Sequence, residues 1–376
     1  MKASSVLSLL SLASGSLAWE WGKSGKWDNK LLKANGHGTA TINYTTITGF
    51  FQQDDPATDA STFDYTKSNF GLINRTYPTD SQFDPQNKRT QWERFAYYVD
   101  TLNRDSDSNS QYKVLFMGRH GEGYHNAAES FYGTPAWNCY WGPLDGNGTV
   151  TWRDAHLTAA GIAQCTKARE FWTQALAASK MPAPQSYYSS PLARSATTAN
   201  LTFASLPLPR NRPFAPVVKE GLREGVSIRT CDARSDRAAL AAALPRFRFE
   251  PGFAERDELW RGDEGQGETA DAHTARTRAV LDDVFAADPN TWISITSHSG
   301  QIAKNLLVLG HRAFGLSTGQ AIPVLVKART LSGSGTTTTT TAAGWSAEAT
   351  CRAPPVTSIA GQGCVCASTV ATATAV

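Results

Sequence analysis

Between residues 111 and 330, short apolar runs alternate with stretches whose apolar residues recur every three or four positions. The runs predict buried strands, and the periodic stretches predict helices that cover them. Five strands are predicted in this way, at 113–117, 187–188, 217–219, 292–296 and 322–327. Strands and helices in alternation are typical of α/β proteins, so we predict a three-layer α/β/α sandwich with a mainly parallel central sheet.

Capping residues set the predicted bounds of the helices. Thr158 is the predicted N-cap of one helix, Ser190 that of a second and Thr269 that of a third. A fourth helix, at 301–309, ends at Gly310. The helix after Thr158 is predicted to bury one face, made of Ile162, Cys165, Ala168, Trp172 and Leu176.

Three segments flank the predicted catalytic domain at 111–330. Residues 1–18 combine a basic residue, an apolar run and a small-residue end, which is typical of a cleaved signal peptide. Residues 19–110 are aromatic and polar with many turn residues, which predicts an irregular N-terminal extension packed on the domain. Residues 331–376 form a low-complexity tail rich in Ser and Thr, so we expect catalysis to survive its deletion.

Other features of the chain agree with the secretory pathway. N-x-[ST] sequons, which are potential N-glycosylation sites, occur at Asn43, Asn74, Asn147 and Asn200. The 6 cysteines are an even number, and disulfides are their expected state in an oxidising compartment. Their connectivity stays open, and a zinc site is disfavoured because the spacing lacks paired C-x₂₋₄-C motifs. We therefore predict a secreted, disulfide-bonded glycoprotein.

Charge is nearly balanced over the chain. The 36 Lys and Arg residues and 33 Asp and Glu residues give a formal net charge of +3. This balance favours neither nucleic acid nor an anionic membrane as a partner. No apolar run after the leader reaches the ~20 residues of a membrane-spanning helix, so we expect a small-molecule partner. The oligomeric state stays open.

Candidate catalytic and binding residues directly follow four of the predicted strands. These sequences are Gly118-Arg119-His120-Gly121-Glu122, Ser189-Ser190-Pro191-Leu192-Ala193-Arg194, Glu220-Gly221-Leu222-Arg223-Glu224 and Ser297-His298-Ser299-Gly300. In open α/β sheets, ligands bind beyond the carboxyl ends of the strands. A mainly parallel sheet therefore brings two histidines, two arginines and a carboxylate to one site.

This set of side chains suits a phosphate ester. Arginine presents a planar fork of donors that matches phosphate oxygens, and a histidine can attack phosphorus to form a phosphohistidine. Arg119, Arg194 and His298 are candidates to neutralise the phosphoryl oxygens. Glu224, or alternatively Glu220, is the candidate to protonate the leaving alkoxide. Because these cations supply the positive charge, no metal or other cofactor is expected.

The same residues resemble the motifs of the histidine phosphatase superfamily, also called phosphoglycerate mutase-like. The resemblance covers roughly 111–330 in the order that the family uses, through Arg119-His120-Gly121-Glu122 with Asn126, Ser190-Pro191-Leu192-Ala193-Arg194, Leu222-Arg223-Glu224, Gly267-Glu268-Thr269 and Ser297-His298-Ser299-Gly300. Tyr124-His125-Asn126 and Thr230-Cys231-Asp232 look like a fungal secreted group of that superfamily. The resemblance implies His120 as the nucleophile, Glu224 as the proton donor and His298 as a further catalytic residue. It implies substrate-binding or supporting roles for Arg119, Asn126, Arg194 and Glu268.

Two departures from the motifs of the superfamily reduce the number of expected functions. The acid phosphatase and phytase branch carries R-H-G-x-R-x-P and a distal His-Asp pair. In this chain Glu122-Gly123-Tyr124 follows Arg119-His120-Gly121, and Ser299 follows His298. Bisphosphoglycerate-dependent mutases carry an L-N-E-R-x-Y-G-type stretch, whereas this chain has Leu222-Arg223-Glu224-Gly225-Val226. We therefore expect a secreted phosphomonoester hydrolase. A phosphoglycerate mutase-like phosphotransferase and a catalytically silent cell-surface glycoprotein are the alternatives.

Two features near these motifs have roles that stay open. His125 follows His120 at a spacing that differs from the H-E-x-x-H motif of metalloproteases, so a metalloprotease site is disfavoured. Contact with substrate is the alternative role for His125. Residues 227–262 are rich in arginine and are predicted to form a cap insertion. This cap is either a solvated surface or a lid that contacts an anionic substrate.

Overall fold

The computed structural model of the chain describes residues 41–331, 344–355 and 364–366. All of them belong to a single unit, His37–Val376. The predicted signal peptide and most of the predicted tail lie outside the described residues. Within the described part, no helix has both the length and the apolar composition needed to cross a membrane.

A seven-stranded sheet lies at the centre of the fold, in the order β1-β8-β2-β7-β3-β4-β5. Neighbouring strands from β2 to β5 are parallel, and β8 is antiparallel to both β1 and β2. The prediction of a mainly parallel sheet is therefore confirmed. The strands are β1 (Thr41–Thr46), β8 (Ala321–Leu331), β2 (Ser110–Arg119), β7 (Trp292–Ser297), β3 (Ser186–Ser189), β4 (Val217–Val218) and β5 (Arg248–Phe249).

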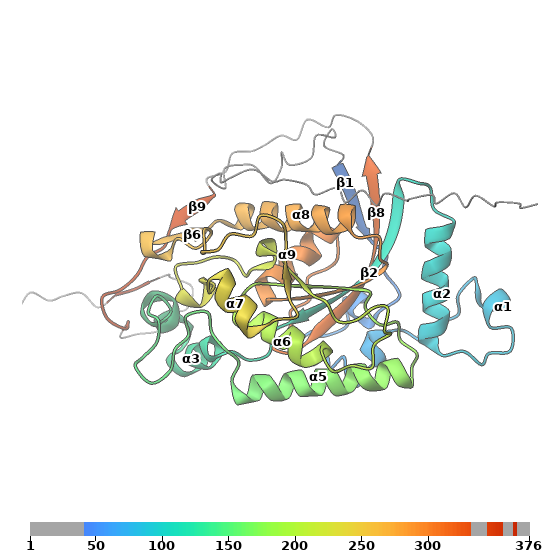
Figure 1. The fold of residues 1–376 in the computed structure, drawn as a ribbon, viewed down its shortest axis with the longest axis horizontal. Coiled ribbons are helices and arrows are strands. Elements are labelled where there is room, and N and C mark those ends of the chain that lie inside the picture. Colours follow the sequence, from blue (N-terminus) through green and yellow to red (C-terminus); the bar gives the residue numbers. More distant parts are fainter. Residues whose placement is uncertain (1–40, 332–343, 356–363, 367–376) are drawn as a thin grey trace, which may run out of the picture. The chain divides into compact units, whose positions relative to one another are not determined.

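Helices cover both faces of the sheet and complete the predicted α/β/α sandwich (Figure 1). One face carries α2 (Gln91–Arg104), α5 (Ala159–Ala177) and α6 (Ala193–Phe203), and the other carries α8 (Ala270–Ala287) and α9 (Ser299–Leu309). β2 contributes to both cores because successive side chains of a strand point to opposite faces. Val114 and Phe116 join the aromatic core under α2 and α5, whereas Leu115 and Met117 join the aliphatic core under α8 and α9.

The predicted caps of three helices are confirmed. Thr158 accepts the backbone N–H of Gly161 at the start of α5, at 3.1 Å. Thr269 accepts the N–H of Ala272 at the start of α8, at 3.2 Å. Gly310 ends α9 in the left-handed conformation, with φ of 74°, which glycine adopts without a steric cost.

Two local predictions are wrong. α6 begins at Ala193 with Leu192 as its N-cap, and the hydroxyl of Ser190 accepts the N–H of Leu192, at 3.3 Å, before the helix starts. Ile162 is 48% exposed, although it continues the periodicity of the face that α5 buries. The buried position in that turn is Gly161, where a Cβ would lie 2.1 Å from the carbonyl oxygen of Glu122. The close approach of α5 to this loop therefore requires glycine.

Residues 41–110, for which no regular element is predicted, contain β1 and α2. β1 has only two buried apolar residues, Ile42 and Tyr44, which is too short an alternation to predict a strand. α2 carries a clearer signal, because Thr90 and Glu93 form a capping box at its start. The described residues also include shorter α-helices, α1 (Asp80–Phe83), α3 (Tyr124–Tyr132), α4 (Thr134–Ala136) and α7 (Arg237–Ala243).

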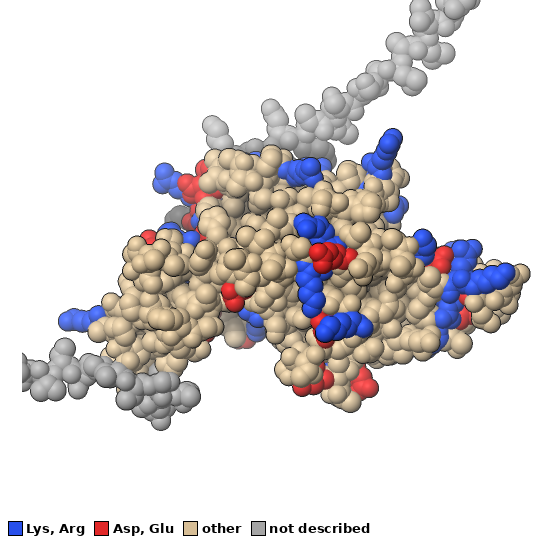
Figure 2. Space-filling model, turned by 90° about the horizontal axis from the view of Figure 1, so that it is seen from below, with Lys and Arg blue, Asp and Glu red and all other residues tan. Residues whose placement is uncertain are grey.

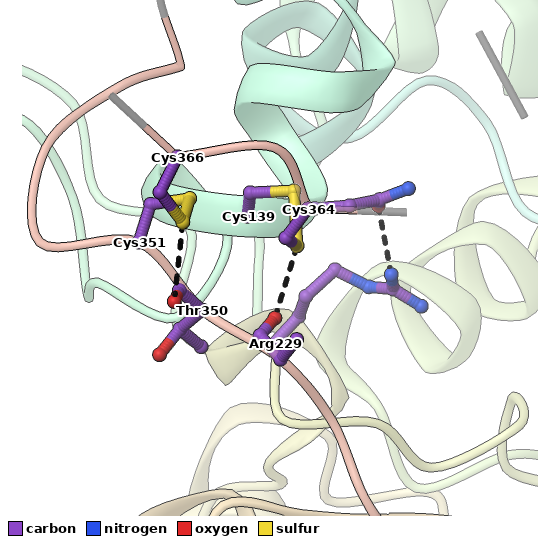
Figure 3. Close-up of a disulfide and its surroundings, with 8 residues drawn as sticks. Cys139, Arg229, Thr350, Cys351, Cys364 and Cys366 are labelled. Carbon is purple, nitrogen blue, oxygen red and sulfur yellow. Dashed lines mark hydrogen bonds between the residues drawn. A yellow bond between two sulfur atoms is a disulfide. The ribbon is translucent and has the colours of Figure 1, made fainter. Parts of the chain in front are cut away.

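Part of the predicted tail is attached to the rest of the fold. β9 (Trp345–Ala347) pairs with β6 (Gln266–Glu268) in a second, antiparallel sheet. Disulfides join Cys139 to Cys364 and Cys351 to Cys366 (Figure 3). The other two cysteines, Cys165 and Cys231, are buried free thiols, so the expected pairing holds for four of the six.

Charged side chains of both signs share the surface. In the view of Figure 2, Lys and Arg lie beside Asp and Glu in short groups, with uncharged surface between them. Both signs of charge are therefore present on this face.

Candidate active site

The carboxyl ends of β2, β7 and β3 lie side by side. Arg119 at the end of β2 pairs with Ser297 of β7, and Ser189 at the end of β3 pairs with Thr296. The residues that follow these strands are therefore neighbours, as the sequence predicts for a parallel sheet.

His120 is buried at this edge with its ring held in one orientation. Its backbone N–H donates to the carbonyl of Ser297 at 3.0 Å, and its Nδ1 lies 2.7 Å from the carbonyl oxygen of Gly121. A carbonyl only accepts, so Nδ1 carries the proton and Nε2 keeps its lone pair. An imidazole in this state can act as a nucleophile.

Two further imidazoles flank His120. The ring centroid of His298 lies 5.0 Å from that of His120, and the centroid of His125 lies 5.4 Å from it. Nε2 of His298 contacts the hydroxyl of Ser190 at 2.8 Å. The Nδ1 atoms of His298 and His125 are both buried, and no described residue forms a hydrogen bond with either of them.

The two predicted arginines lie at the same site. Arg119 donates through Nη1 to the carbonyl of Leu316 at 2.7 Å, and Arg194 donates through Nη1 to the carbonyl of Cys231 at 2.6 Å. The Nε atoms of both arginines are buried and have no hydrogen-bond partner in the part of the chain that the structure describes. Arg194 lies in the first turn of α6, where a positive charge opposes the helix dipole.

The electrostatics of the site favour an anion. Burial, and then the charge of Arg194, lower the pKa of His120, His125 and His298 well below the ordinary value. Buried donors without partners are rare in folded proteins and call for an explanation. A tetrahedral anion would satisfy them and neutralise the arginines. We call Arg119, His120, Arg194 and His298 the phosphate site.

Glu224 lies beside the phosphate site at the N-terminus of α9. Its carboxylate accepts the backbone N–H groups of Gly300 at 3.0 Å and of Gln301 at 2.9 Å. A Cβ on Gly300 would lie 2.3 Å from Oε1 of Glu224, so glycine makes this approach possible. Hydrogen bonds from a helix N-terminus stabilise a carboxylate. The carboxylate of Glu224 therefore caps α9.

Glu220, the alternative proton donor, is buried in a network of ion pairs. Its carboxylate lies 2.7 Å from Nη1 of Arg223 and 2.9 Å from Nε of Arg234. Arg223 also forms an ion pair with Asp257, at 2.7 Å. Arg234 and Asp257 belong to the predicted cap at 227–262, so this network ties the cap to the loop after β4.

Glu268 and Asn126 support backbone near the site. Glu268 forms an ion pair with Arg276 at 2.6 Å, and Arg276 donates to the carbonyl of Glu224 at 3.0 Å. Asn126 accepts the N–H of Gly123 at 3.1 Å and so caps α3. Glu268 therefore acts on the loop that holds Glu224, and Asn126 on the helix that carries His125.

Two buried aspartates escape the prediction from sequence. Asp154 accepts the N–H groups of Ala193 and Ser235, both at 2.8 Å, and so fixes the start of α6. Asp232 lies 3.7 Å from Nη2 of Arg194. The resemblance of Thr230-Cys231-Asp232 to the fungal group is the one sequence feature that points to Asp232. No local sequence pattern points to Asp154.

Comparison with known proteins identifies relatives of the chain. The model of the histidine phosphatase superfamily (branch 1) matches residues 142–312, which include Arg194, Glu224 and His298 but begin after His120. A protein of Arthroderma benhamiae named "Probable phosphoglycerate mutase" is 48% identical over 289 residues, which are 77% of this chain and 85% of the relative. "Phosphomutase-like protein 3" of Candida albicans is 33% identical over 75% of this chain and 79% of its own length.

The solved structures that match the chain share less of its sequence. A mycobacterial glucosyl-3-phosphoglycerate phosphatase is 19% identical, with a TM-score of 0.33, over 56% of this chain and 90% of that protein. A phosphoglycerate mutase from Thermus thermophilus is 21% identical, with a TM-score of 0.31, over 56% of this chain and 91% of that protein.

Proposed function

Because the chain belongs to the histidine phosphatase superfamily, we propose that it is a secreted phosphomonoester hydrolase with His120 as its nucleophile. One observation carries the proposal. The imidazole of His120 lies among buried donor groups of Arg119, Arg194 and His298 that have no partner among the described residues. A phosphoryl group fits both the charge and the donors of this site.

The first chemical step transfers the phosphoryl group to His120. Nε2 attacks phosphorus, the N–P bond forms, and the bond from phosphorus to the ester oxygen breaks. The Nδ1–H bond to the carbonyl of Gly121 stabilises the positive charge that the ring acquires. Arg119, Arg194 and His298 hold the three non-bridging oxygens as their charge redistributes. An acid gives the leaving alkoxide its proton.

The second step returns His120 to its initial state. Water attacks the phosphohistidine, the N–P bond breaks, and phosphate leaves. The attacking water loses its proton to the group that acted as acid in the first step, now a base. If an alcohol replaces water as the acceptor, the same intermediate supports a phosphotransferase.

Glu224 is the acid that the resemblance assigns, and its place beside the phosphate site supports this role. Its carboxylate also accepts the backbone N–H groups of Gly300 and Gln301, and these bonds fix its position. Glu220, in contrast, is held between two arginines, so Glu224 is the acid in this proposal.

A phosphoglycerate mutase-like phosphotransferase is the second candidate function, because a relative at 48% identity carries the name of a mutase. The two functions differ in the acceptor of the phosphoryl group. We expect release of inorganic phosphate from monoesters at a rate that matches consumption of the ester. Stoichiometric transfer to an added alcohol or phosphoglycerate, without free phosphate, would favour the mutase instead.

The direct test of the hydrolase is a rapid quench with a ³²P-labelled aryl phosphate, followed by peptide mapping. We expect acid-labile, base-stable label on the peptide that contains His120 and no label on the His120→Ala protein. The His156→Ala protein is the matched control, because His156 is exposed and lies outside the site. Turnover of the His120→Ala protein at the rate of the unmodified enzyme would overturn the proposal.

Two observations support the proposed secretion. The described residues contain two disulfides, and the sequons at Asn43, Asn74 and Asn147 are exposed. Mass spectrometry of culture medium is expected to find a chain that begins near Trp19, with glycans at these asparagines. Retention inside the cell of a chain that begins at Met1 would contradict export.

A further inference from the structure

His125 is a buried imidazole at the phosphate site to which neither the resemblance nor the proposed mechanism gives a role. It lies in the first turn of α3 and is 8% exposed. Its ring packs on Gly123, where a Cβ would lie 2.7 Å from Nδ1, so glycine leaves the space that the ring occupies. The ring of His120 is a close neighbour, and 5.4 Å separates its centroid from that of His125.

The hydrogen bonding of His125 differs from that of the buried histidines elsewhere in the fold. His273 contacts Oε1 of Gln301 at 2.9 Å, and His311 contacts the carbonyl of Arg312 at 2.7 Å. Nδ1 of His125 is buried without a partner, and among the described residues no hydrogen bond reaches its Nε2. A purely structural histidine of this burial is expected to have a partner, as the other two have.

Burial and the charged groups around His125 disfavour the protonated ring in the free protein. Burial lowers the pKa of His125 most, and Arg194 on α6, His120 and Arg119 at the end of β2, and Arg229 in the loop before η6 (Thr230–Asp232) lower it further. The nearby carboxylates already face cations: Asp232 faces Arg194 and Arg229, and Glu129 on α3 acts on Arg119 and Arg229. A bound phosphoryl dianion would place negative charge beside His125 and so favour its protonated form.

On the basis of the proposed function, we propose that His125 is a fifth member of the phosphate site and takes up a proton from solvent when a phosphoryl dianion binds. The imidazolium donates a hydrogen bond to a phosphoryl oxygen and offsets one negative charge. Binding of the dianion then becomes linked to pH. The association constant rises up to tenfold for each unit by which pH falls, over the range in which the free imidazole is neutral and the bound one charged.

Calorimetric titration with tungstate tests this coupling on the full-length protein. At low micromolar concentration, at which it does not condense to polytungstates, tungstate is a tetrahedral dianion near neutral pH and does not itself exchange protons. Titrations at pH 7.5 in buffers with different enthalpies of ionisation measure the protons taken up per tungstate bound. We expect about one proton for the unmodified protein and close to none for His125→Gln, with roughly tenfold weaker binding of tungstate at pH 6.5. His156→Gln is the control and is expected to match the unmodified protein.

The possible outcomes separate this inference from the proposed function. Failure of tungstate to bind the unmodified protein would count against the phosphate site itself. Binding with the same proton uptake in His125→Gln would leave the phosphate site standing and overturn the role of His125. If His125→Gln does not fold, histidine ¹⁵N spectra of the unmodified protein decide. The His125 ring is expected to change from neutral to imidazolium on addition of tungstate, and a ring that stays neutral overturns the proposal.

Discussion

The hydroxyl of Ser190 lies 2.8 Å from Nε2 of His298, although 108 residues separate the two in the chain. Ser190 follows β3 and His298 follows β7, and these strands are parallel neighbours in the sheet. The same hydroxyl accepts the backbone N–H of Leu192 at 3.3 Å, which orients its own proton toward Nε2. Nδ1 of His298 then carries the proton of the imidazole and can donate to a phosphoryl oxygen.

We expect Ser190→Ala to lower kcat/KM about tenfold, because His298 loses the hydrogen bond that sets its tautomer and orientation. Steady-state hydrolysis of an aryl phosphate measures the effect. Ser189→Ala is the matched control, since Ser189 is equally buried but its hydroxyl bonds the carbonyl of Ser190 at 2.9 Å. Equal losses in the two variants would show that packing, and not the contact with His298, is responsible.

Glu224→Gln separates a catalytic acid from a helix cap. As an acid, Glu224 matters most for poor leaving groups, so we expect an alkyl phosphate to lose roughly 10²–10⁴-fold in kcat and an aryl phosphate far less. As a cap alone, the variant would lower the free energy of unfolding by about 1 kcal/mol and reduce both rates equally. Parallel measurement of both esters and of urea unfolding distinguishes the two roles.

The buried histidines predict that the folded state is less stable in acid. Burial and Arg194 lower the pKa of His120, His125 and His298 in the folded chain, whereas in the unfolded chain these groups titrate near 6.5. Below that pH the unfolded chain binds more protons. Stability is therefore fully present above about pH 6.5 and falls as pH drops, by about 1.4 kcal/mol per pH unit for each histidine.

Urea unfolding between pH 7.5 and pH 5 measures this slope. His120→Gln is expected to reduce it by about one proton, whereas His156→Gln leaves it unchanged because His156 is exposed. An unchanged slope in the His120 variant would mean that its imidazole titrates alike in both states.

The attached part of the tail predicts a loss of stability on truncation. Deletion after Leu331 removes β9 and both disulfides, of which Cys139–Cys364 spans 225 residues. We expect the midpoint of thermal unfolding to fall, while turnover at low temperature persists because the phosphate site lies within β2 to α9. A Cys139→Ser, Cys364→Ser double variant is expected to lose about 2–5 kcal/mol, as typical for a native disulfide. A truncated chain that keeps its unfolding midpoint would contradict this expectation.

Local pattern was sufficient to predict the central strands, three helix caps and the residues brought together at the phosphate site. Apolar periodicity reports which face of an element is buried, and parallel strands bring their carboxyl ends to one edge. His120, Arg194 and His298 could therefore be chosen from their positions directly after predicted strands or at a helix start.

The tertiary structure alone decided what each of these groups contacts. The cap that Glu224 provides for α9, the ion pairs that hold Glu220, and the pairing of Cys139 with Cys364 join residues far apart in the chain. His125 is similar in this respect, since its missing partner is visible only when every neighbour is in place. Periodicity records whether a side chain is buried, but the identity of its neighbours depends on how separate elements pack, and no local pattern encodes that.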